Sequence, residues 1–162
     1  MKGARKGKDI NERSTKMLGC VHIYVNKKDR EISLLKAYIT KIGYGQAMGY
    51  LIPTKREGLK SDVLTCIEDS LSAYQQDIEA TQAFKVSPYK TWNKFFKYHD
   101  HISIYFDTKD RTYSITMGER DEKTYSYGNP LPDCEFILTK EEFNEKFDEI
   151  MDFLISKVKM IK

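Results

Sequence analysis

The chain has 162 residues, of which 40% are hydrophobic and 31% charged, and its net charge at pH 7 is +3. This length supports one domain with a sizeable core, and this composition excludes an intrinsically disordered chain. No apolar run is long enough to span a membrane, and the basic N-terminus lacks the hydrophobic segment of a secretory signal. We therefore expect a cytoplasmic protein with no membrane partner.

The positive charge is concentrated at the N-terminus. Residues 1–16 hold six lysines and arginines against two carboxylates, so the rest of the chain carries a small negative excess. The segment has little to bury, which predicts a basic flexible tail over 1–16 and a single folded domain over 17–162. Nucleic-acid-binding domains need a basic face on the folded part itself, so the near-neutral body argues against nucleic acid as the partner.

Two alternating runs follow the tail. Val21, Ile23 and Val25 alternate with His22 and Tyr24, and a turn-like stretch separates them from a second apolar run. This pattern predicts two β-strands joined by a turn. The glycine-punctuated stretch GYGQAMGYLIP that comes next predicts an irregular strand or a bend.

An amphipathic helix is predicted over 61–80, with Ser61 as its N-cap. Its apolar residues recur at three- and four-residue spacing, which places them on one face. From Ser61 to Phe84 the sequence holds five carboxylates and no lysine or arginine, whereas solvated helix faces normally mix both signs. The five are Asp62, Glu68, Asp69, Asp77 and Glu79.

A second helix is predicted over 88–98, with Pro88 at its first position, where the missing N–H removes no bond. Its apolar edge consists of Trp92, Phe95 and Phe96. Three runs of alternating residues then predict an antiparallel meander over 101–127, followed by a proline-containing loop and a short edge strand at CEFIL.

The last predicted helix covers 140–158. Thr139 and Glu142 have the spacing of a capping box, in which each side chain bonds the backbone of the other. The order of elements predicts an α+β fold: an antiparallel β-sheet, made of the 101–127 meander and the N-terminal strands, packed with two to three α-helices in a single domain.

The most enzyme-like cluster is His99, Asp100 and His101. On an extended strand the two histidines share a face, a spacing that can hold a metal. His22 is the one further histidine in the sequence, and no HExxH motif accompanies the pair. We interpret the cluster as a helix-to-strand junction, and predict no catalytic residue, no metal site and no enzymatic activity. A small enzyme built on this pair is the weakest of three function classes.

The three cysteines indicate no chemistry either. Cys20, Cys66 and Cys134 are odd in number, lie far apart and form no CxxC pair. This spacing argues against a disulfide framework or a structural zinc site, and favours reduced thiols. We expect no cofactor.

Tyrosines on the predicted strands are able, in principle, to stack nucleobases. Cross-strand aromatic pairs are nevertheless the ordinary use of such residues, and no RNA-recognition motif is present, so we favour a structural role. A nucleic-acid-binding module that uses the basic tail and these tyrosines is the alternative function. The residues are Tyr24, Tyr105, Tyr113, Tyr125 and Tyr127.

The second half of the chain resembles a known family. KTWNKFFKYHDHISIYFD leads into RTYSITMGERDEKTYSY, then into a proline-containing loop and a helix opened by LTKEEFNEKF. Together with the earlier helix LKSDVLTCIEDSLSAY, this order over about 44–158 is similar to that of immunity proteins from bacterial contact-dependent growth inhibition systems. The resemblance is one of element order and patterning, and it contains no catalytic motif.

The resemblance implies a cytoplasmic protein without enzymatic activity. Such a protein binds the toxic C-terminal domain of a cognate delivery protein, often a nuclease, and blocks its active site. Nuclease sites are electropositive because they hold phosphates, so carboxylates on the inhibitor favour association. The acidic helix and the GERDEK hairpin tip supply such carboxylates. We expect the toxin-binding residues to be Glu68, Asp69, Asp77, Glu79, Glu119, Asp121 and Glu122.

Overall fold

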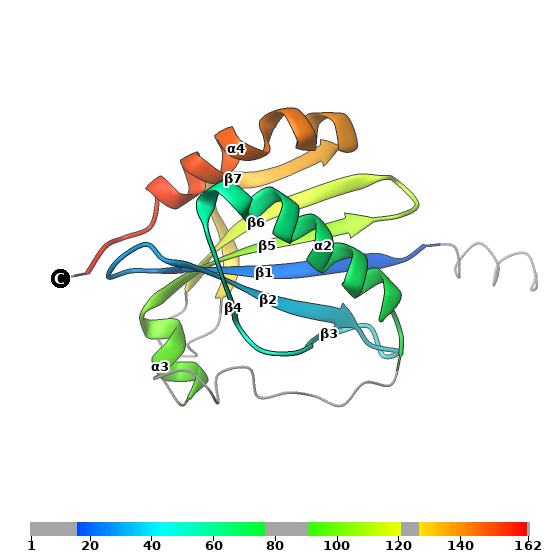
Figure 1. Cartoon of the computed structure of the whole chain (residues 1–162), viewed down its shortest axis with the longest axis horizontal. Coiled ribbons are helices and arrows are strands. Elements are labelled where there is room, and N and C mark those ends of the chain that lie inside the picture. The colour runs from blue at the N-terminus through cyan, green and yellow to red at the C-terminus, as the bar shows by residue number, and fades with distance from the viewer. Residues whose placement is uncertain (1–15, 77–90, 121–126, 162) are drawn as a thin grey trace, which may run out of the picture.

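The computed structural model describes residues 16–76, 91–120 and 127–161. These residues form one antiparallel sheet of seven strands, together with three α-helices (Figure 1). The α+β prediction is confirmed. None of the helices in these ranges is long and apolar enough to cross a membrane. The strands are β1 (Leu18–Asn26), β2 (Ile32–Ile39), β3 (Gly45–Ala47), β4 (Ile52–Thr54), β5 (His99–Asp107), β6 (Thr112–Arg120) and β7 (Tyr127–Thr139). The helices are α2 (Leu59–Ser72), α3 (Trp92–Lys97) and α4 (Lys140–Ser156).

The sheet joins the two halves of the chain. Its order is β3-β2-β1-β5-β6-β7, with β4 paired to β2 beside β3. The N-terminal hairpin and the meander meet where β1 pairs with β5, for example Val21 with Ile104. Both hairpins follow from local alternation and turns. The β1–β5 pairing is long-range and was not predicted.

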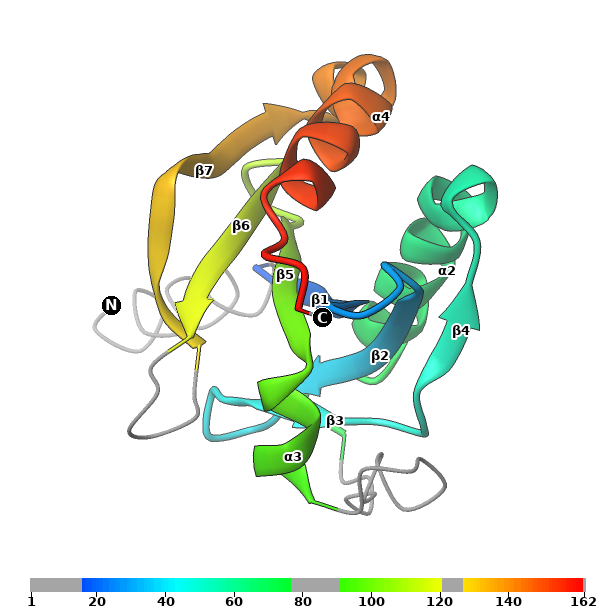
Figure 2. The same ribbon diagram turned by 90° about the vertical axis from the view of Figure 1, so that its left-hand side faces the viewer.

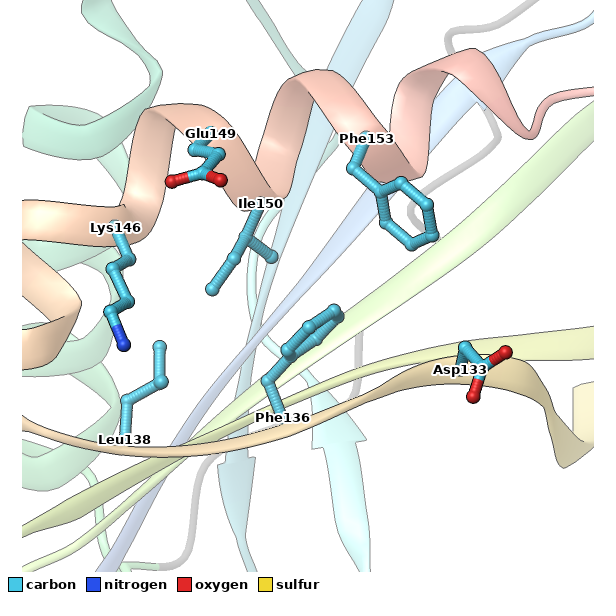
Figure 3. A pocket seen from close by; sticks show the side chains of 7 residues that line it. All are labelled: Asp133, Phe136, Leu138, Lys146, Glu149, Ile150 and Phe153. Carbon is cyan, nitrogen blue, oxygen red and sulfur yellow. The ribbon is translucent and has the colours of Figure 1, made fainter.

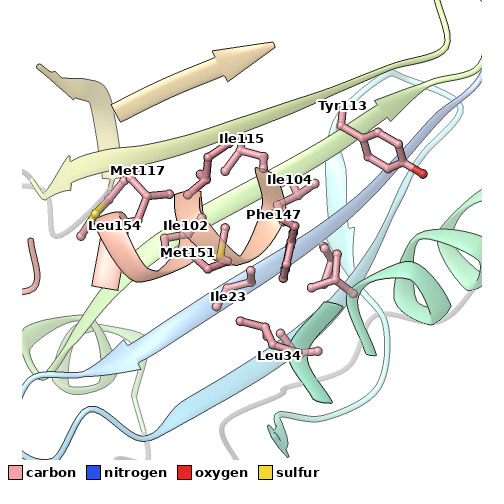
Figure 4. Packing of buried hydrophobic residues seen from close by; sticks show 14 of the residues in the cluster. Ile23, Leu34, Ile102, Ile104, Tyr113, Ile115, Met117, Phe147, Met151 and Leu154 are labelled. Atoms are coloured by element: carbon pink, nitrogen blue, oxygen red, sulfur yellow. The ribbon is translucent and has the colours of Figure 1, made fainter. Parts of the chain in front are cut away.

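One face of the sheet carries the main hydrophobic core. Side chains alternate between the two faces of a strand, and Ile102, Ile104 and Phe106 all lie on the core face, as predicted. Helices α2 and α4 cover this face and pack their apolar sides against it (Figures 1 and 4). The inner face predicted for the last helix is buried throughout: Phe143, Phe147, Ile150, Met151, Leu154 and Val158.

Helix α3 packs on the opposite face of the sheet (Figure 2). Tyr24 and Leu35 point away from the main core and pack with Phe95. The Tyr24 and Phe95 rings meet edge-on, with their centroids 4.9 Å apart. Trp92 and Phe96, predicted with Phe95 as a buried edge, are only partly buried against this cluster.

Helix α2 begins earlier than predicted. Its N-cap is Gly58, which makes no side-chain cap, so the prediction of Ser61 as N-cap is wrong. A 3-10 turn, Arg56–Gly58, leads directly into the helix. Leu59 is fully buried and holds the first turn against the core. Tertiary packing thus overrides the local capping signal.

The same helix also ends earlier than predicted, at Ser72 instead of residue 80. Gln75 adopts a left-handed φ of 55°, which a continuing helix does not allow. Its N–H donates to the carbonyl of Ile39 at 2.8 Å, so the chain leaves the helix to bond the end of β2.

Both later helices have side-chain N-caps. Thr139 and Glu142 form the predicted capping box of α4. The N-cap of α3 is Thr91, whose hydroxyl accepts from the N–H of Lys94. The helix therefore begins at Trp92 and not at Pro88, so the predicted start is wrong: Thr91 has an extended backbone and caps the first turn, and Pro88 itself lies outside the described residues.

The last strand of the meander is longer than predicted. β7 runs from Tyr127 to Thr139, so the expected proline-containing loop and the CEFIL strand form one strand; residues 124–126 lie outside the described ranges. Its pairing with β6 is irregular between Thr116 and Arg120, which indicates a β-bulge. β7 lies at the edge of the sheet, where a proline removes no ladder bond from the interior.

The predicted basic tail lies almost entirely outside the described residues. Lys16 is the part of it that is described, and its ammonium group lies 3.4 Å from the Asp107 carboxylate. The division into a flexible tail and a domain therefore stays a prediction.

Arg56 links the turn before α2 to α4. Its Nε donates to Asp152 Oδ1 at 2.9 Å, and its Nη1 donates to Asp148 Oδ1 at 3.1 Å. Its Nη2 also donates to the backbone carbonyl of Asp148 at 2.8 Å. These bonds connect the two elements that cover the core face, and they engage two carboxylates of α4.

Helix α2 lies close against β1 at Gly19. A Cβ added to Gly19 would lie 2.9 Å from Leu71 Cγ and 3.0 Å from the carbonyl oxygen of Ile67. The carbonyl belongs to the helix backbone and cannot rotate away. The spacing between helix and sheet therefore requires a glycine at this position.

We expect Gly19→Ala to lower the free energy of unfolding by about 1–3 kcal/mol, because the methyl group pushes α2 off the sheet. Gly45→Ala is the matched control, since a Cβ there meets nothing within 4 Å. It should change stability by less than about 0.5 kcal/mol. Urea unfolding of both variants measures the difference, and equal stabilities would contradict the close approach.

Candidate functional site

Two of the predicted toxin-binding carboxylates lie next to each other on α2. Glu68 is exposed, and its charge adds to burial in raising the pKa of the Tyr113 phenol. Asp69 is half-buried, and its Oδ2 lies 2.6 Å from Lys36 Nζ on β2. That hydrogen bond raises the pKa of Lys36. Asp69 therefore links the helix to the sheet, and Glu68 is the carboxylate presented to solvent.

The structure does not describe the side chains of the other predicted carboxylates. Asp77, Glu79, Asp121 and Glu122 lie outside the described residues. Glu119 is part of β6, and its side chain is not described. Whether these five lie near Glu68 stays a prediction.

The histidine cluster sits where α3 ends and β5 begins, as predicted. His99 is buried and stacks on the Phe95 ring, with centroids 3.9 Å apart. Its Nδ1 lies 2.8 Å from the carbonyl oxygen of Phe95. These two contacts connect the first residue of β5 to helix α3 and so give His99 a structural role at the junction.

His101 has a partner that the sequence did not reveal. Its Nε2 lies 2.7 Å from Nδ1 of His22 on β1. Burial lowers the pKa of His22 to about 4 and, together with the charge of His22, lowers that of His101 well below 6.5. Both imidazoles are therefore neutral at pH 7, and one donates to the other.

This histidine pair is not arranged as a metal site. In this hydrogen bond one nitrogen carries the proton and the other accepts it with its lone pair, so neither of these two nitrogens offers a lone pair to a metal ion. Within the described ranges, no group of three or more His, Cys, Asp or Glu side chains is placed to hold a metal ion. The absence of a metal centre and of enzymatic activity stays a prediction.

The cysteines are free and buried. Burial raises the pKa of all three thiols, and that of Cys66 to about 11. A raised pKa disfavours the thiolate, which is the nucleophilic form. These thiols are core residues.

The described strand tyrosines pack inside the protein. Tyr24 is 5% exposed and Tyr113 is 7% exposed. The Tyr113 ring stacks on Phe143 of α4, with centroids 4.0 Å apart. Tyr105 packs against the small cluster around Cys20. Tyr125 lies outside the described residues, and the side chain of Tyr127 is not described.

An acidic surface that the sequence reasoning did not select lies on α4. Glu141, Glu145 and Glu149 are exposed and recur every fourth residue, so they form one row, which we call the glutamate stripe. The described ion pairs of this helix engage other carboxylates: Arg56 binds Asp148 and Asp152, and Lys146 lies 3.8 Å from Glu142. The four-residue spacing was the signal available in the sequence.

A cleft of about 410 Å³ opens between α4 and β7 beside the glutamate stripe (Figure 3). Glu149 belongs to both features, and Lys146 stands next to it on the rim. We call this feature the α4–β7 cleft. Its apolar wall consists of Phe136, Leu138, Ile150 and Phe153.

The same fold occurs in solved structures of other proteins. A protein of unknown function from Neisseria meningitidis superposes with a TM-score of 0.54 at 12% sequence identity, covering 87% of this chain and 95% of that chain. A chain of the CdiA-CT/CdiI toxin and immunity complex from Yersinia pseudotuberculosis superposes with a TM-score of 0.52 at 15% identity, covering 86% and 96%. No family model matches the sequence, and a search of curated proteins found no match.

At these identities the likeness establishes a shared fold over nearly the whole of each chain. Fold and site together define a small α+β protein with an acidic helix beside an apolar cleft. One structure with this fold comes from a toxin and immunity complex.

Proposed function

We propose that the chain is an immunity protein that binds and neutralises a cognate toxin domain. The observation that carries this proposal is the fold shared with a chain of the Yersinia toxin and immunity complex. The elements behind the family resemblance are present in this fold: a helix before a strand meander, and a capped terminal helix. In this proposal the protein acts in a contact-dependent growth inhibition system, and its partner is the C-terminal domain of the delivery protein.

In this proposal the protein covers the active site of the toxin, which we take to be a nuclease. A nuclease site is electropositive because it must hold phosphates. Glu68 and the glutamate stripe present carboxylates to solvent on two helices. Complementary charge of this kind raises the association rate and selects the partner.

Inhibition by binding needs no catalytic residue and no cofactor. The buried thiols and the neutral histidine pair fit a structural role, because neither is poised as a nucleophile or a proton carrier at pH 7. We place the protein in the cytoplasm, where free thiols persist.

The nucleic-acid-binding alternative has little support from the described residues. Tyr24 and Tyr113 are buried, so their rings are not available to stack on bases. The basic tail is the remaining argument for it. We keep this function as an outcome of the experiment below.

The proposal is tested by co-expressing the protein with the product of the neighbouring open reading frame. We expect a stable 1:1 complex in gel filtration and survival of cells that would otherwise be killed by that product. A toxin domain from an unrelated strain serves as the control, and it should neither bind nor be neutralised. Salt-dependent binding to oligonucleotides without any complex would support the alternative.

A further inference from the structure

We propose that the α4–β7 cleft receives a large apolar side chain from a lysine- or arginine-rich segment of the partner protein. The identity of that partner as a toxin domain rests on the proposed function. The chemistry of the segment rests on the cleft itself.

The walls of the cleft are apolar, and its two phenylalanines are partly open to solvent, whereas Leu138 and Ile150 are buried. Phe136 on β7 and Phe153 on α4 meet edge-to-face, with ring centroids 6.3 Å apart. Phe153 is 37% exposed, although it is a large aromatic side chain. In Figure 3, Ile150 and Phe136 point into the cleft from the helix and the strand. An apolar group that covers these walls releases water from them, which favours binding.

The cleft has the size of an anchor site. Its volume of about 410 Å³ lies at the lower end of the range for binding pockets. Lys146 and Glu149, which also line the cleft, are exposed, so their charged ends remain in water. Aromatic or long aliphatic side chains in such pockets supply much of the energy of protein–protein interfaces.

The charges around the cleft determine which residues the partner segment can carry on either side of its apolar side chain. Asp133 lies at one end, and Glu149 and the neighbouring Glu145 are exposed along the helix. Two cations lie at the cleft: Lys146, 3.8 Å from the Glu142 carboxylate, and Lys157, whose Nζ lies 5.1 Å from the centroid of the Phe153 ring. Against them stand four carboxylates, those of Asp133, Glu142, Glu145 and Glu149. The rim is therefore negative, which attracts a segment with cationic flanks and repels an acidic one.

The first test measures the affinity of the toxin domain for cleft variants. We expect Phe153→Ala to raise the dissociation constant by roughly tenfold or more, because it removes one apolar wall. Phe153→Leu keeps an apolar wall and should retain most of the affinity. Ile137→Ala is the matched control: Ile137 is 69% exposed on the same β7 strand but does not line the cleft. Binding by Phe153→Ala within twofold of the parent protein would overturn the inference.

The second test does not need the toxin. N-acetyl-Lys-Phe-Lys-amide and N-acetyl-Glu-Phe-Glu-amide are titrated separately into ¹⁵N-labelled protein at low salt. We expect the lysine peptide to shift the amide signals of residues 133–138 and 146–153, and to saturate at a lower concentration than the glutamate peptide. Equal titrations, shifts elsewhere or no shift would overturn the inference.

The two tests separate this inference from the proposed function. If the toxin binds and Phe153→Ala has no effect, the immunity proposal stands and the cleft is not the anchor site. If the toxin does not bind but the lysine peptide occupies the cleft, the immunity proposal fails and the chemistry of the cleft stands.

Discussion

Acidification from pH 6.5 to 4.5 is expected to lower the free energy of unfolding by about 2–4 kcal/mol through the His22–His101 pair. Burial lowers the pKa of His22 to about 4, and burial and the charge of His22 lower that of His101 well below 6.5. The two ring nitrogens lie 2.7 Å apart, so protonation of both rings would place two N–H groups against each other.

The sign of this effect follows from proton linkage. In the folded protein both histidines resist protonation, whereas in the unfolded chain they protonate near pH 6.5. The unfolded state therefore binds more protons between about pH 6.5 and pH 4, and stability falls as the pH is lowered through that window. Above pH 6.5 these histidines are mostly neutral in both states, so little of this stability is lost. Each histidine adds a slope of at most about 1.4 kcal/mol per pH unit.

Urea unfolding at pH 7, 6 and 5 measures this dependence. Most carboxylates titrate below this range, so the histidines dominate the slope. A His22→Gln, His101→Gln variant keeps hydrogen-bonding groups but cannot take up protons. It should show a much shallower dependence, with His99 as the remaining buried imidazole. Equal stability of the parent protein at pH 7 and pH 5 would contradict the interpretation.

The second large effect is expected on toxin association. Glu149→Lys should slow the association rate roughly tenfold at low salt, because it reverses a charge on both the glutamate stripe and the cleft rim. The loss should shrink as salt is added, since exposed charges are screened. Glu31→Lys is the control: it changes the net charge equally at an exposed position in the turn before β2. Stopped-flow or surface-based kinetics at two salt concentrations provides the measurement.

Glu68→Lys in the same assay tests the surface that the sequence predicted. Glu68 suits this purpose because its neighbour Asp69 is bonded to Lys36, so reversing Asp69 would confuse binding with stability. A slower rate for Glu68→Lys alone would place the partner over α2 instead of α4. If neither Glu68→Lys nor Glu149→Lys alters the kinetics, carboxylates on these helices do not guide the toxin.

Features that depend on neighbours within a few residues were read correctly from the sequence. Alternation placed Ile102 and Ile104 on the core face, and three- and four-residue spacing placed the inner side of α4. The spacing of Thr139 and Glu142 identified the capping box. Each of these depends on fixed local geometry, namely the twofold repeat of a strand or the helical turn.

Element boundaries were less well predicted. Ser61 has the side chain of a good cap, but the N-cap is Gly58, three residues earlier, where Leu59 is buried in the core. The loop expected before CEFIL became part of β7, because an edge strand accommodates prolines. In both cases a packing or pairing partner distant in sequence decided the local conformation.

The sequence by itself determined an α+β protein with two hairpin units, an acidic α2 and a capped terminal helix. Tertiary structure alone decided that β1 pairs with β5, which brings His22 to His101 across 79 residues of sequence. It also decided that Arg56 binds Asp148 and Asp152, and that β7 and α4 enclose an apolar cleft beside exposed glutamates. The physical reason is that contacts between distant segments depend on how whole elements pack, and no repeat within one element encodes them.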